Sequence, residues 1–261
     1  MTSGAIATRA SALLRWERPI CLALAVFILL SVAWYWAGYD LSYRGIDYRL
    51  YMDATRRWLS GGGFYGPQEL AGSFAVTYGV TLYPPVALLV FAPFTVLPPI
   101  AWWIVPLGLT AWGLVRLKPA PWSWPLVVLP LVWWTAAERI VSGNPVIWSL
   151  AALTLACSAG WPGVFVLLKP SLFPFAFVGG WRREWWVALL GLALLSLPFL
   201  PMWFEWLAVL RHAKTPAGLL YSAQEAPLLL IPLVAWVASP IGPMPTLRAV
   251  WTRNREPGVR E

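Results

Sequence analysis

The chain has 261 residues, of which 59% are hydrophobic and only 11% are charged. Soluble domains carry about 25% charged residues, and the apolar runs here are continuous instead of alternating, so the composition excludes a soluble domain and a transmembrane β-barrel. The net charge of +8 comes from basic residues at the two tails and in short loops, where they set membrane topology and meet anionic lipid headgroups, so it does not indicate a nucleic-acid partner.

Apolar runs close to 20 residues long recur along the whole chain, and a run of this length crosses a hydrocarbon core about 30 Å thick. Run 19–37 is interpreted as a retained span instead of a signal peptide, because no small-residue cleavage site and soluble domain follow it. We therefore predict an all-α, polytopic transmembrane helical bundle of about eight spans, forming a single integral membrane domain over residues 1–261. The predicted spans are 19–37, 82–97, 99–115, 121–137, 145–159, 161–179, 185–204 and 226–241.

The distribution of lysine and arginine predicts the orientation of these spans. Basic residues gather at the N-terminus, in the turn 181–183 and in the tail 242–261. An even number of spans places all three groups, and hence both termini, in the cytoplasm of a cell whose plasma (inner) membrane holds the protein. Arg116 and Lys118 would then face outside, which conflicts with the same rule.

Two hydrophilic segments, 38–81 and 205–225, are extracytoplasmic in this scheme. The first is too long for a plain connector, and loops of this length are usually functional. Within it, Asp47–Ser60 has the spacing of an amphipathic helix lying on the membrane surface, which ends at Gly61-Gly62-Gly63. One face of this helix holds Asp47, Leu50, Tyr51, Ala54 and Trp58, and the other holds Arg49, Asp53, Arg56 and Arg57.

The two acids of this helix differ in their surroundings. Asp53 has arginines four residues away in both directions, which is typical of a solvated structural residue. Asp47 lies at the helix start, on the side of the apolar stripe, and has no arginine three or four residues further on. It is either an N-cap, which accepts hydrogen bonds from backbone N–H groups, or a functional acid.

The residues around Asp47 resemble a known family. Asp47, Tyr51, Ala54, Leu59, Gly62 and Tyr65 follow the pattern D-x3-Y-x2-A-x4-L-x-x-G-x-x-Y, and Tyr83-Pro84-Pro85 opens the next run. Gly143-Asn144 stands where the family often has Gly-Gln, Leu168-Lys169-Pro170 is similar to its later Lys-Pro motif, and residues 221–224 are similar to an Asn-Gln-Ser segment. This set resembles glycosyltransferase family 87, membrane enzymes of the C-type glycosyltransferase fold that use polyprenyl-phosphate sugars.

The resemblance implies an inverting enzyme that transfers a hexose, with mannose expected, from a polyprenyl phosphate to a lipid or glycan acceptor at the outer membrane face. It also implies that Asp47 is the catalytic base, with Asp40 as the alternative, and that no cofactor is needed. The competing hypothesis is a non-catalytic membrane protein that binds or moves lipid-linked sugars, or a partner subunit of a larger transferase. Membrane lipids are partners under both hypotheses.

Cations are the expected partners of the donor phosphate. Lys169 lies inside a predicted span, where a charge indicates function unless its head reaches an interface, and Arg139 has Glu138 as an alternative ion-pair partner. The tyrosines of the set either stack on a sugar or pack as ordinary aromatics. The predicted substrate-binding residues are Lys169, Arg49, Tyr51, Tyr83, Asn144, Arg139, Arg211, His212 and Gln224.

The sequence predicts no metal site. His212 is the only histidine, and the two cysteines, Cys21 and Cys157, lie inside apolar runs, where we expect them to act as small hydrophobic residues. A metal site built from several histidines is therefore excluded, and the predicted chemistry needs only a carboxylate and cations.

Overall fold

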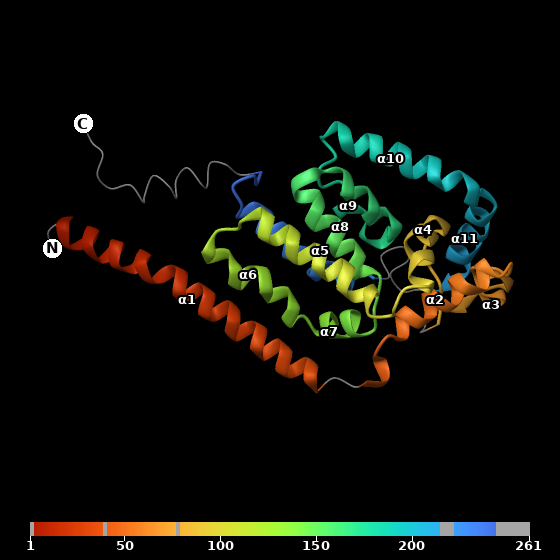
Figure 1. The fold of residues 1–261 in the computed structure, drawn as a ribbon, viewed down its shortest axis with the longest axis horizontal. Helices are drawn as coiled ribbons and strands as arrows, with labels where there is room; N and C mark the ends of the chain where they lie inside the picture. Colours follow the sequence, from red (N-terminus) through yellow and green to blue (C-terminus); the bar gives the residue numbers. More distant parts are fainter. Residues whose placement is uncertain (1–2, 39–40, 77–78, 215–221, 244–261) are drawn as a thin grey trace.

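A computed structural model of the protein describes residues 3–38, 41–76, 79–214 and 222–243 (Figure 1). Most of these residues are helical, which confirms the helical part of the predicted fold. The α-helices are α1 (Ser3–Ala37), α2 (Ile46–Leu59), α3 (Pro67–Ala71), α4 (Leu88–Phe91), α5 (Ala101–Leu117), α6 (Trp124–Val128), α7 (Trp134–Val141), α8 (Val146–Ala159), α9 (Phe173–Ala176), α10 (Arg183–Ser196), α11 (Leu200–His212) and α12 (Ala226–Val237). The strands β1 (Phe74–Ala75) and β2 (Ala213–Lys214) have two residues each.

Short 3₁₀ helices join or extend many of these elements. Proline stands in the first turn of most of them, where its missing N–H is tolerated because the first N–H groups of a helix have no intrahelical partner. They are η1 (Leu41–Tyr43), η2 (Pro85–Ala87), η3 (Ala92–Thr95), η4 (Pro121–Ser123), η5 (Leu129–Val132), η6 (Trp161–Leu168), η7 (Pro170–Leu172), η8 (Leu197–Phe199) and η10 (Ala223–Glu225).

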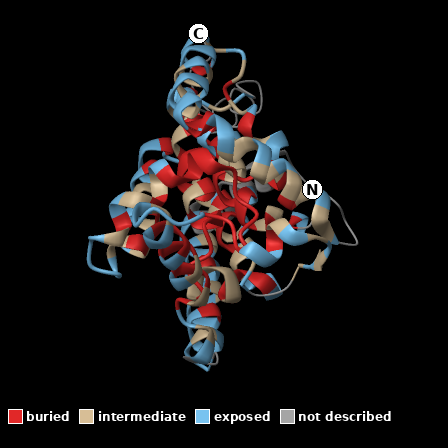
Figure 2. Cartoon of the chain, turned by 90° about the vertical axis from the view of Figure 1, so that its right-hand side faces the viewer, coloured by how far each residue is buried: buried red, intermediate tan, exposed pale blue. Residues whose placement is uncertain are grey.

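Helix α8 lies at the centre of the bundle. It is apolar all round, as a helix enclosed by protein should be, and most of its side chains are buried. It packs against α5, α12 and η6, and its small residues together with Gly113 of α5 allow the close approach of α5 at Thr154. In Figure 2 the buried residues accordingly gather in the middle of the molecule, and exposed residues surround them.

Helices α5, α8 and α12 run in the same direction. Near their starts, the Trp102 and Trp148 rings lie 5.4 Å apart, and near their ends Ala120 N donates to Ala238 O over 2.9 Å. The bundle therefore has two ends. We call the end where these helices begin the site end, and the end where they finish the basic end, because Arg116, Lys118, Arg182 and Arg183 lie there or directly beside it.

The predicted span 161–179 is a hairpin of short helices instead of one helix. It leaves the basic end after α8, reaches its tip at Lys169 and returns, so that Gly179 lies against Gly160 and Gly163 lies against the carbonyls of Ala176 and Val178. We call residues 161–179 the re-entrant hairpin. Glycine is required by the close backbone approach at Gly163 and Gly179, since a Cβ at either position would lie within 3 Å of a neighbouring backbone atom.

The predicted span 82–97 is shorter than predicted and does not cross the bundle. Its helical part, Pro85–Thr95, consists of η2, α4 and η3 in succession, and residues near both ends lie at the site end: Tyr83 O accepts from Tyr65, and Thr95 O accepts from Arg56 of α2. Because this segment stays at the site end, α5 runs in the opposite direction from the one predicted. Arg116 and Lys118 therefore lie at the same end as the basic turn Arg182-Arg183. The prediction that they face the opposite side from this turn is wrong.

Two helical stretches among the described residues are long and apolar enough to cross a membrane, Arg18–Ala37 and Arg183–His212. The pair Pro121–Val132 and Trp134–Val141, bent by 74°, is a third if it counts as one span. The remaining apolar helices are shorter: Pro85–Thr95, Ala101–Leu117, Val146–Ala159 and Ala223–Val237. The predicted runs 19–37 and 185–204 thus lie in long helices, while the total of eight spans stays a prediction.

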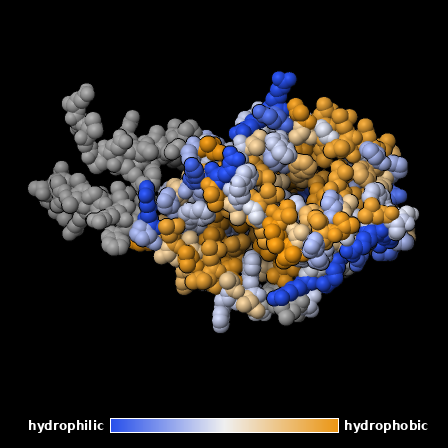
Figure 3. All heavy atoms as spheres, in the orientation of Figure 1, coloured by the Kyte–Doolittle hydropathy of each residue, from blue (hydrophilic) through white to orange (hydrophobic). Residues whose placement is uncertain are grey.

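The predicted amphipathic helix is present as α2. Asp47, Tyr51 and Ala54 of its stripe are buried, and its arginine face is exposed; Figure 3 shows hydrophilic residues at the lower right, where Figure 1 draws α2. The helix ends at Leu59 before Gly61, whose φ is +89°. Its buried face packs on protein, for example through Tyr51 on Phe91 at 5.2 Å, so this face does not lie on lipid as predicted.

The two predicted outer segments meet at the site end. Strands β1 and β2 pair in parallel, Phe74 with Ala213 and Ala75 with Lys214, and His212 Nδ1 lies 3.1 Å from Glu69 O. The second segment is not a loop from residue 205 onward, because α11 continues to His212. Most of the predicted basic tail 242–261 lies outside the described residues.

The two-ended arrangement predicts opposite accessibility for two exposed residues. In a chain with Cys21→Ala and Cys157→Ala, Ser73→Cys at the site end should react with a membrane-impermeant maleimide on intact cells. Lys118→Cys at the basic end should react only after permeabilisation, because positive residues favour the cytoplasmic side. Labelling of both cysteines from the same side would contradict this arrangement.

Candidate functional site

Backbone hydrogen bonds dock the first turn of α2 on the turn between α7 and α8. Gly45 N donates to Val141 O over 3.0 Å, and Asp47 N donates to Ser142 O over the same distance. The turn itself is fixed from the other side, because Trp102 Nε1 donates to Gly143 O over 2.8 Å. Gly143 has a φ of +73°, which a side chain would disfavour. These contacts place Asp47 directly beside Ser142 and Asn144.

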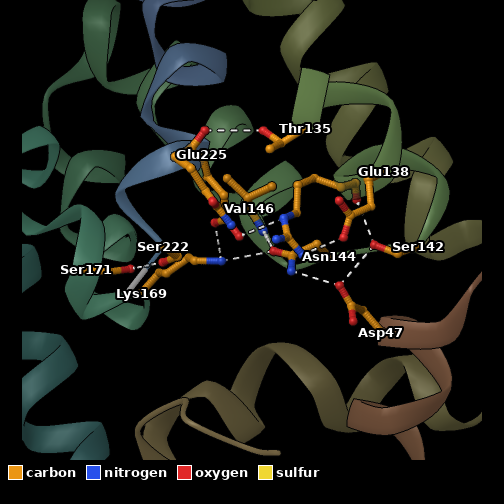
Figure 4. A network of polar contacts seen from close by, with 12 residues as sticks. Asp47, Thr135, Glu138, Ser142, Asn144, Val146, Lys169, Ser171, Ser222 and Glu225 are labelled. Carbon is orange, nitrogen blue, oxygen red and sulfur yellow. Dashed lines mark hydrogen bonds and ion pairs between the residues drawn. The ribbon is translucent and has the colours of Figure 1, made fainter. Parts of the chain in front are cut away.

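The carboxylate of Asp47 is buried, with 7% exposure, and its two oxygens have different roles. Oδ2 accepts hydrogen bonds from Ser142 Oγ at 2.9 Å and from Asn144 Nδ2 at 2.8 Å (Figure 4). From the described residues, no donor contacts Oδ1. The N-cap of α2 is Gly45, and no side chain caps the helix, so the N-cap interpretation of Asp47 is wrong.

Asn144 connects Asp47 to a buried lysine. Its Oδ1 accepts from Lys169 Nζ at 2.9 Å and from Val146 N at 3.0 Å. Lys169, at the tip of the re-entrant hairpin, is 2% exposed. The lysine predicted inside a span therefore does not reach an interface, and it lies in the same network as Asp47.

Glu225 is the counterion of this lysine, and the sequence did not predict its role. It is 2% exposed; its Oε2 forms an ion pair with Lys169 Nζ, and its Oε1 lies 3.2 Å from Arg139 Nε. Arg139 also lies 3.3 Å from Glu138, the partner named as an alternative above. The only signal for Glu225 was a single acid directly before an apolar run, which is also typical of an ordinary helix start.

Tyrosines form one wall of the site. Tyr83 and Tyr51 meet edge to face at 5.0 Å, and Lys169 Nζ lies 5.4 Å from the centre of the Tyr83 ring. Tyr65 anchors this wall, because its hydroxyl donates to Tyr83 O over 2.9 Å. Burial, assisted by Glu205 and Glu69, raises the pKa of Tyr65 well above its usual range, so the hydroxyl stays protonated and keeps this hydrogen bond.

These groups surround a polar cavity of about 360 Å³. Ser222, which contacts Ser171, and Glu225 belong to its wall although neither was predicted. Val76, Gly79 and Val80 line another side of the cavity. Of the predicted site residues, the cavity wall contains Asp47, Tyr51, Tyr83, Arg139, Asn144, Lys169 and Gln224.

The other predicted residues lie elsewhere. Arg49 is exposed and donates to Arg44 O over 2.8 Å, and Arg211 is exposed at the end of α11. His212 contacts Glu69 O instead of the cavity. Asp40, the alternative base, lies outside the described residues.

Asp53 is a surface residue, as predicted, but its ion-pair partner differs. Arg56 lies 3.1 Å from it, and both side chains are more than half exposed. Arg57 binds the carbonyls of Gly63 and Phe64 instead, both at 2.7 Å. The pair contributes little to stability because water and salt screen it.

An apolar cavity of about 230 Å³ adjoins the polar one. Tyr83 and Lys169 belong to both walls, and the apolar wall continues over Phe91, Trp148 and Phe165. A ligand that combines a polar head with a hydrocarbon chain would match this pair of cavities in its chemistry.

The described residues contain no cluster of three or more histidine, cysteine or acidic side chains that could hold a metal ion. Comparison with protein families, with curated proteins and with solved structures finds no match. The resemblance through Asp47, Tyr51 and Tyr65 therefore stays a prediction. The structure adds that these three residues are buried at the site end, with Asp47 and Tyr51 in the cavity wall.

Gly143→Ala should destabilise the protein more than Gly61→Ala. Both glycines have positive φ, which costs another residue about 1–2 kcal/mol. A Cβ at Gly61 meets nothing within 4 Å, whereas one at Gly143 would lie 2.6 Å from Trp103 and 3.0 Å from Tyr48. Thermal unfolding in detergent should show a Tm loss at least about twice as large for Gly143→Ala. Equal losses would mean that the turn is loosely packed.

Proposed function

We propose that the protein is an integral membrane glycosyltransferase that moves a hexose from a polyprenyl phosphate to a lipid or glycan acceptor at the outer membrane face. One observation carries the proposal. The buried carboxylate of Asp47 has one oxygen held by two hydrogen bonds, while no donor among the described residues contacts its other oxygen. This carboxylate lies in the wall of a polar cavity that adjoins an apolar one. The resemblance to glycosyltransferase family 87 supplies the substrate class.

In this proposal Asp47 is the general base. Its Oδ1 accepts the proton of the acceptor hydroxyl while the hydroxyl oxygen bonds to the anomeric carbon and the bond from that carbon to the phosphate oxygen breaks. The hexose is transferred to the acceptor with inversion at the anomeric carbon, and polyprenyl phosphate is the leaving group and second product. A positioned base of this kind typically contributes a factor of about 10²–10⁴ to the rate.

The remaining groups have matching roles. Arg139 is the cation assigned to the donor phosphate, because it lies in the cavity wall and its guanidinium carries five N–H donors. Tyr51 and Tyr83 offer ring surfaces to the sugar, and the apolar cavity takes the first part of the hydrocarbon chain. None of these steps requires a cofactor.

The proposal also fixes the orientation in the membrane. We infer six passes, by α1, α5, α6 with α7, α8, α10 with α11, and α12, together with the re-entrant hairpin, instead of eight spans. Short helices such as α8 can complete a pass where neighbouring protein covers their ends. The basic end is then cytoplasmic, both termini lie on that side, and Asp47 faces the outside.

A non-catalytic role in binding lipid-linked sugars is the second candidate. It is favoured by one observation: Lys169 and Arg139 already pair with Glu225, so the cations of the cavity are neutralised before a ligand arrives. Such a protein would bind polyprenyl-phosphate sugars without transferring the hexose, which the following experiment distinguishes.

Asp47→Asn should abolish transfer of labelled hexose from polyprenyl phosphate by the purified protein in lipid, with a rate loss of about 10²–10⁴-fold. The amide oxygen of asparagine can still accept from Ser142 and Asn144, so the variant should fold and bind donor normally. The control Asp53→Asn removes only an exposed ion pair and should keep full activity. If Asp47→Asn matches the wild type, Asp47 is not the base, and donor binding by a wild type that transfers nothing would favour the second candidate.

Ala152→Phe should fill part of the apolar cavity, since Ala152 lies in its wall. Because this change removes space for the hydrocarbon chain, the KM for a long-chain donor should rise by about tenfold, equivalent to 1.4 kcal/mol of binding. A donor with a short prenyl chain should be affected much less. Ala111→Phe, at an exposed position of α5, is the matched control; equal effects on both donors would show that the chain binds elsewhere.

A further inference from the structure

The ammonium of Lys169 is held by protein groups from several segments of the chain. Its ammonium lies 2.9 Å from Asn144 Oδ1, forms an ion pair with Glu225, and lies 5.4 Å from the centre of the Tyr83 ring, within range of a cation–π interaction. An ammonium group has three N–H donors. Asn144 and Glu225 take two of these donors, and the Tyr83 ring lies beside the ammonium. The charge of Lys169 is therefore directed at protein groups, whereas the sequence suggested contact with a substrate phosphate.

We propose that Lys169 and Glu225 are positioning residues, which act through Asn144 by holding the carboxylate of Asp47 in the orientation that a base requires. The role of Asp47 as a base in this inference rests on the proposed function, the transfer of a hexose. The chain Glu225–Lys169–Asn144–Asp47 joins η10, the tip of the re-entrant hairpin, the turn before α8 and the first turn of α2 (Figure 4).

The step from Lys169 to Asn144 fixes the direction of an amide. The two ends of an asparagine side chain are nearly equal in shape, and only their hydrogen bonds decide which end faces which neighbour. Lys169 Nζ and Val146 N are both donors, so they require Oδ1. Nδ2 must then face Asp47, where it donates. Without the lysine, only Val146 N would hold Oδ1, so less would oppose a flipped amide, whose oxygen would lie against the carboxylate oxygen of Asp47.

Asn144 also separates the lysine from the base. An ammonium paired directly with Asp47 would stabilise its carboxylate and make it a weaker base. The neutral amide passes on the orientation without supplying a positive charge. This explains why the lysine lies in the network but does not contact the acid that it serves.

Glu225 keeps both cations in place. It is as deeply buried as Lys169, and each of its oxygens holds a different cation, Oε1 that of Arg139 and Oε2 that of Lys169. Removing one partner of a buried ion pair leaves the other charge uncompensated. Without Glu225, Asp47 carries the remaining negative charge of the chain Glu225–Lys169–Asn144–Asp47 and attracts the ammonium, so the amide between them would lose its fixed position.

The first test measures this arrangement independently of any reaction. The chain has two asparagines, Asn144 and Asn254, so protein labelled with [15N]asparagine in detergent micelles gives two pairs of side-chain NH₂ signals. The signal of Asn144 is assigned by its loss in Asn144→Ser. Its exchange with water should be slow in the wild type and about tenfold or more faster in Glu225→Gln and in Lys169→Met.

The control is Glu138→Gln, which removes a neighbouring carboxylate that lies 3.3 Å from Arg139, and it should leave the exchange of Asn144 unchanged. Glu225→Asp keeps the negative charge and is measured if Glu225→Gln does not fold. The exchange rate of Asn144 in this variant should lie between the rates in the wild type and in Glu225→Gln. Unchanged exchange in both Glu225→Gln and Lys169→Met would overturn the proposal, as would an equal acceleration in Glu138→Gln.

The second test uses transfer from a polyprenyl-phosphate hexose. Lys169→Met, which leaves Arg139 paired with Glu225, should lower kcat by about 100-fold and change KM little, because the base loses its orientation while the cation assigned to the donor phosphate keeps its partner. In an Asp47→Asn background the same change should cost nothing further, since residues that act through one group are not additive. A rise in KM alone, or an equal loss in both backgrounds, would overturn the positioning role. If the wild type transfers no sugar, the proposed function fails, and the exchange measurement still decides the arrangement.

Discussion

The docking of α2 on the α7–α8 turn is the interaction on which the site depends. Three backbone N–H groups, those of Gly45, Asp47 and Tyr48, donate to the carbonyls of Val141 and Ser142. These bonds satisfy part of the helix N-terminus, whose first N–H groups have no partner within the helix. Because backbone groups make them, they hold the helix start whatever side chains stand there. Asp47 is thus free to use its carboxylate for another purpose than capping.

The charges of the site are arranged as a buried network with few exposed members. Lys169 and Glu225 are almost fully enclosed, and burial of either charge alone would be costly. Glu225 joins two cations, and Asn144 joins one of them to Asp47. The network therefore links four segments that are distant in sequence, and the loss of one member affects the position of the others.

Local patterns in the sequence were sufficient for several parts of this result. The spacing of apolar residues located α2 and separated Asp47 from Asp53, and the lysine inside an apolar run identified Lys169. Hydropathy does not report the direction of the chain, however, so it could not reveal that residues 82–97 stay at the site end or that 161–179 form a hairpin. Glu225 was missed because its partner Lys169 is remote in sequence. Arg211 and His212 carried suitable chemistry, but α11 and its contact with Glu69 direct them away from the cavity.

The re-entrant hairpin has a consequence for the biogenesis of the protein. A ribosome synthesises Lys169 well before Glu225, so during translation the lysine enters apolar surroundings without its counterion. Its tip can settle only when α12, the last of the described helices, arrives with Glu225 at its start. The site is therefore completed late in synthesis, and a chain truncated before α12 leaves the charge of Lys169 uncompensated.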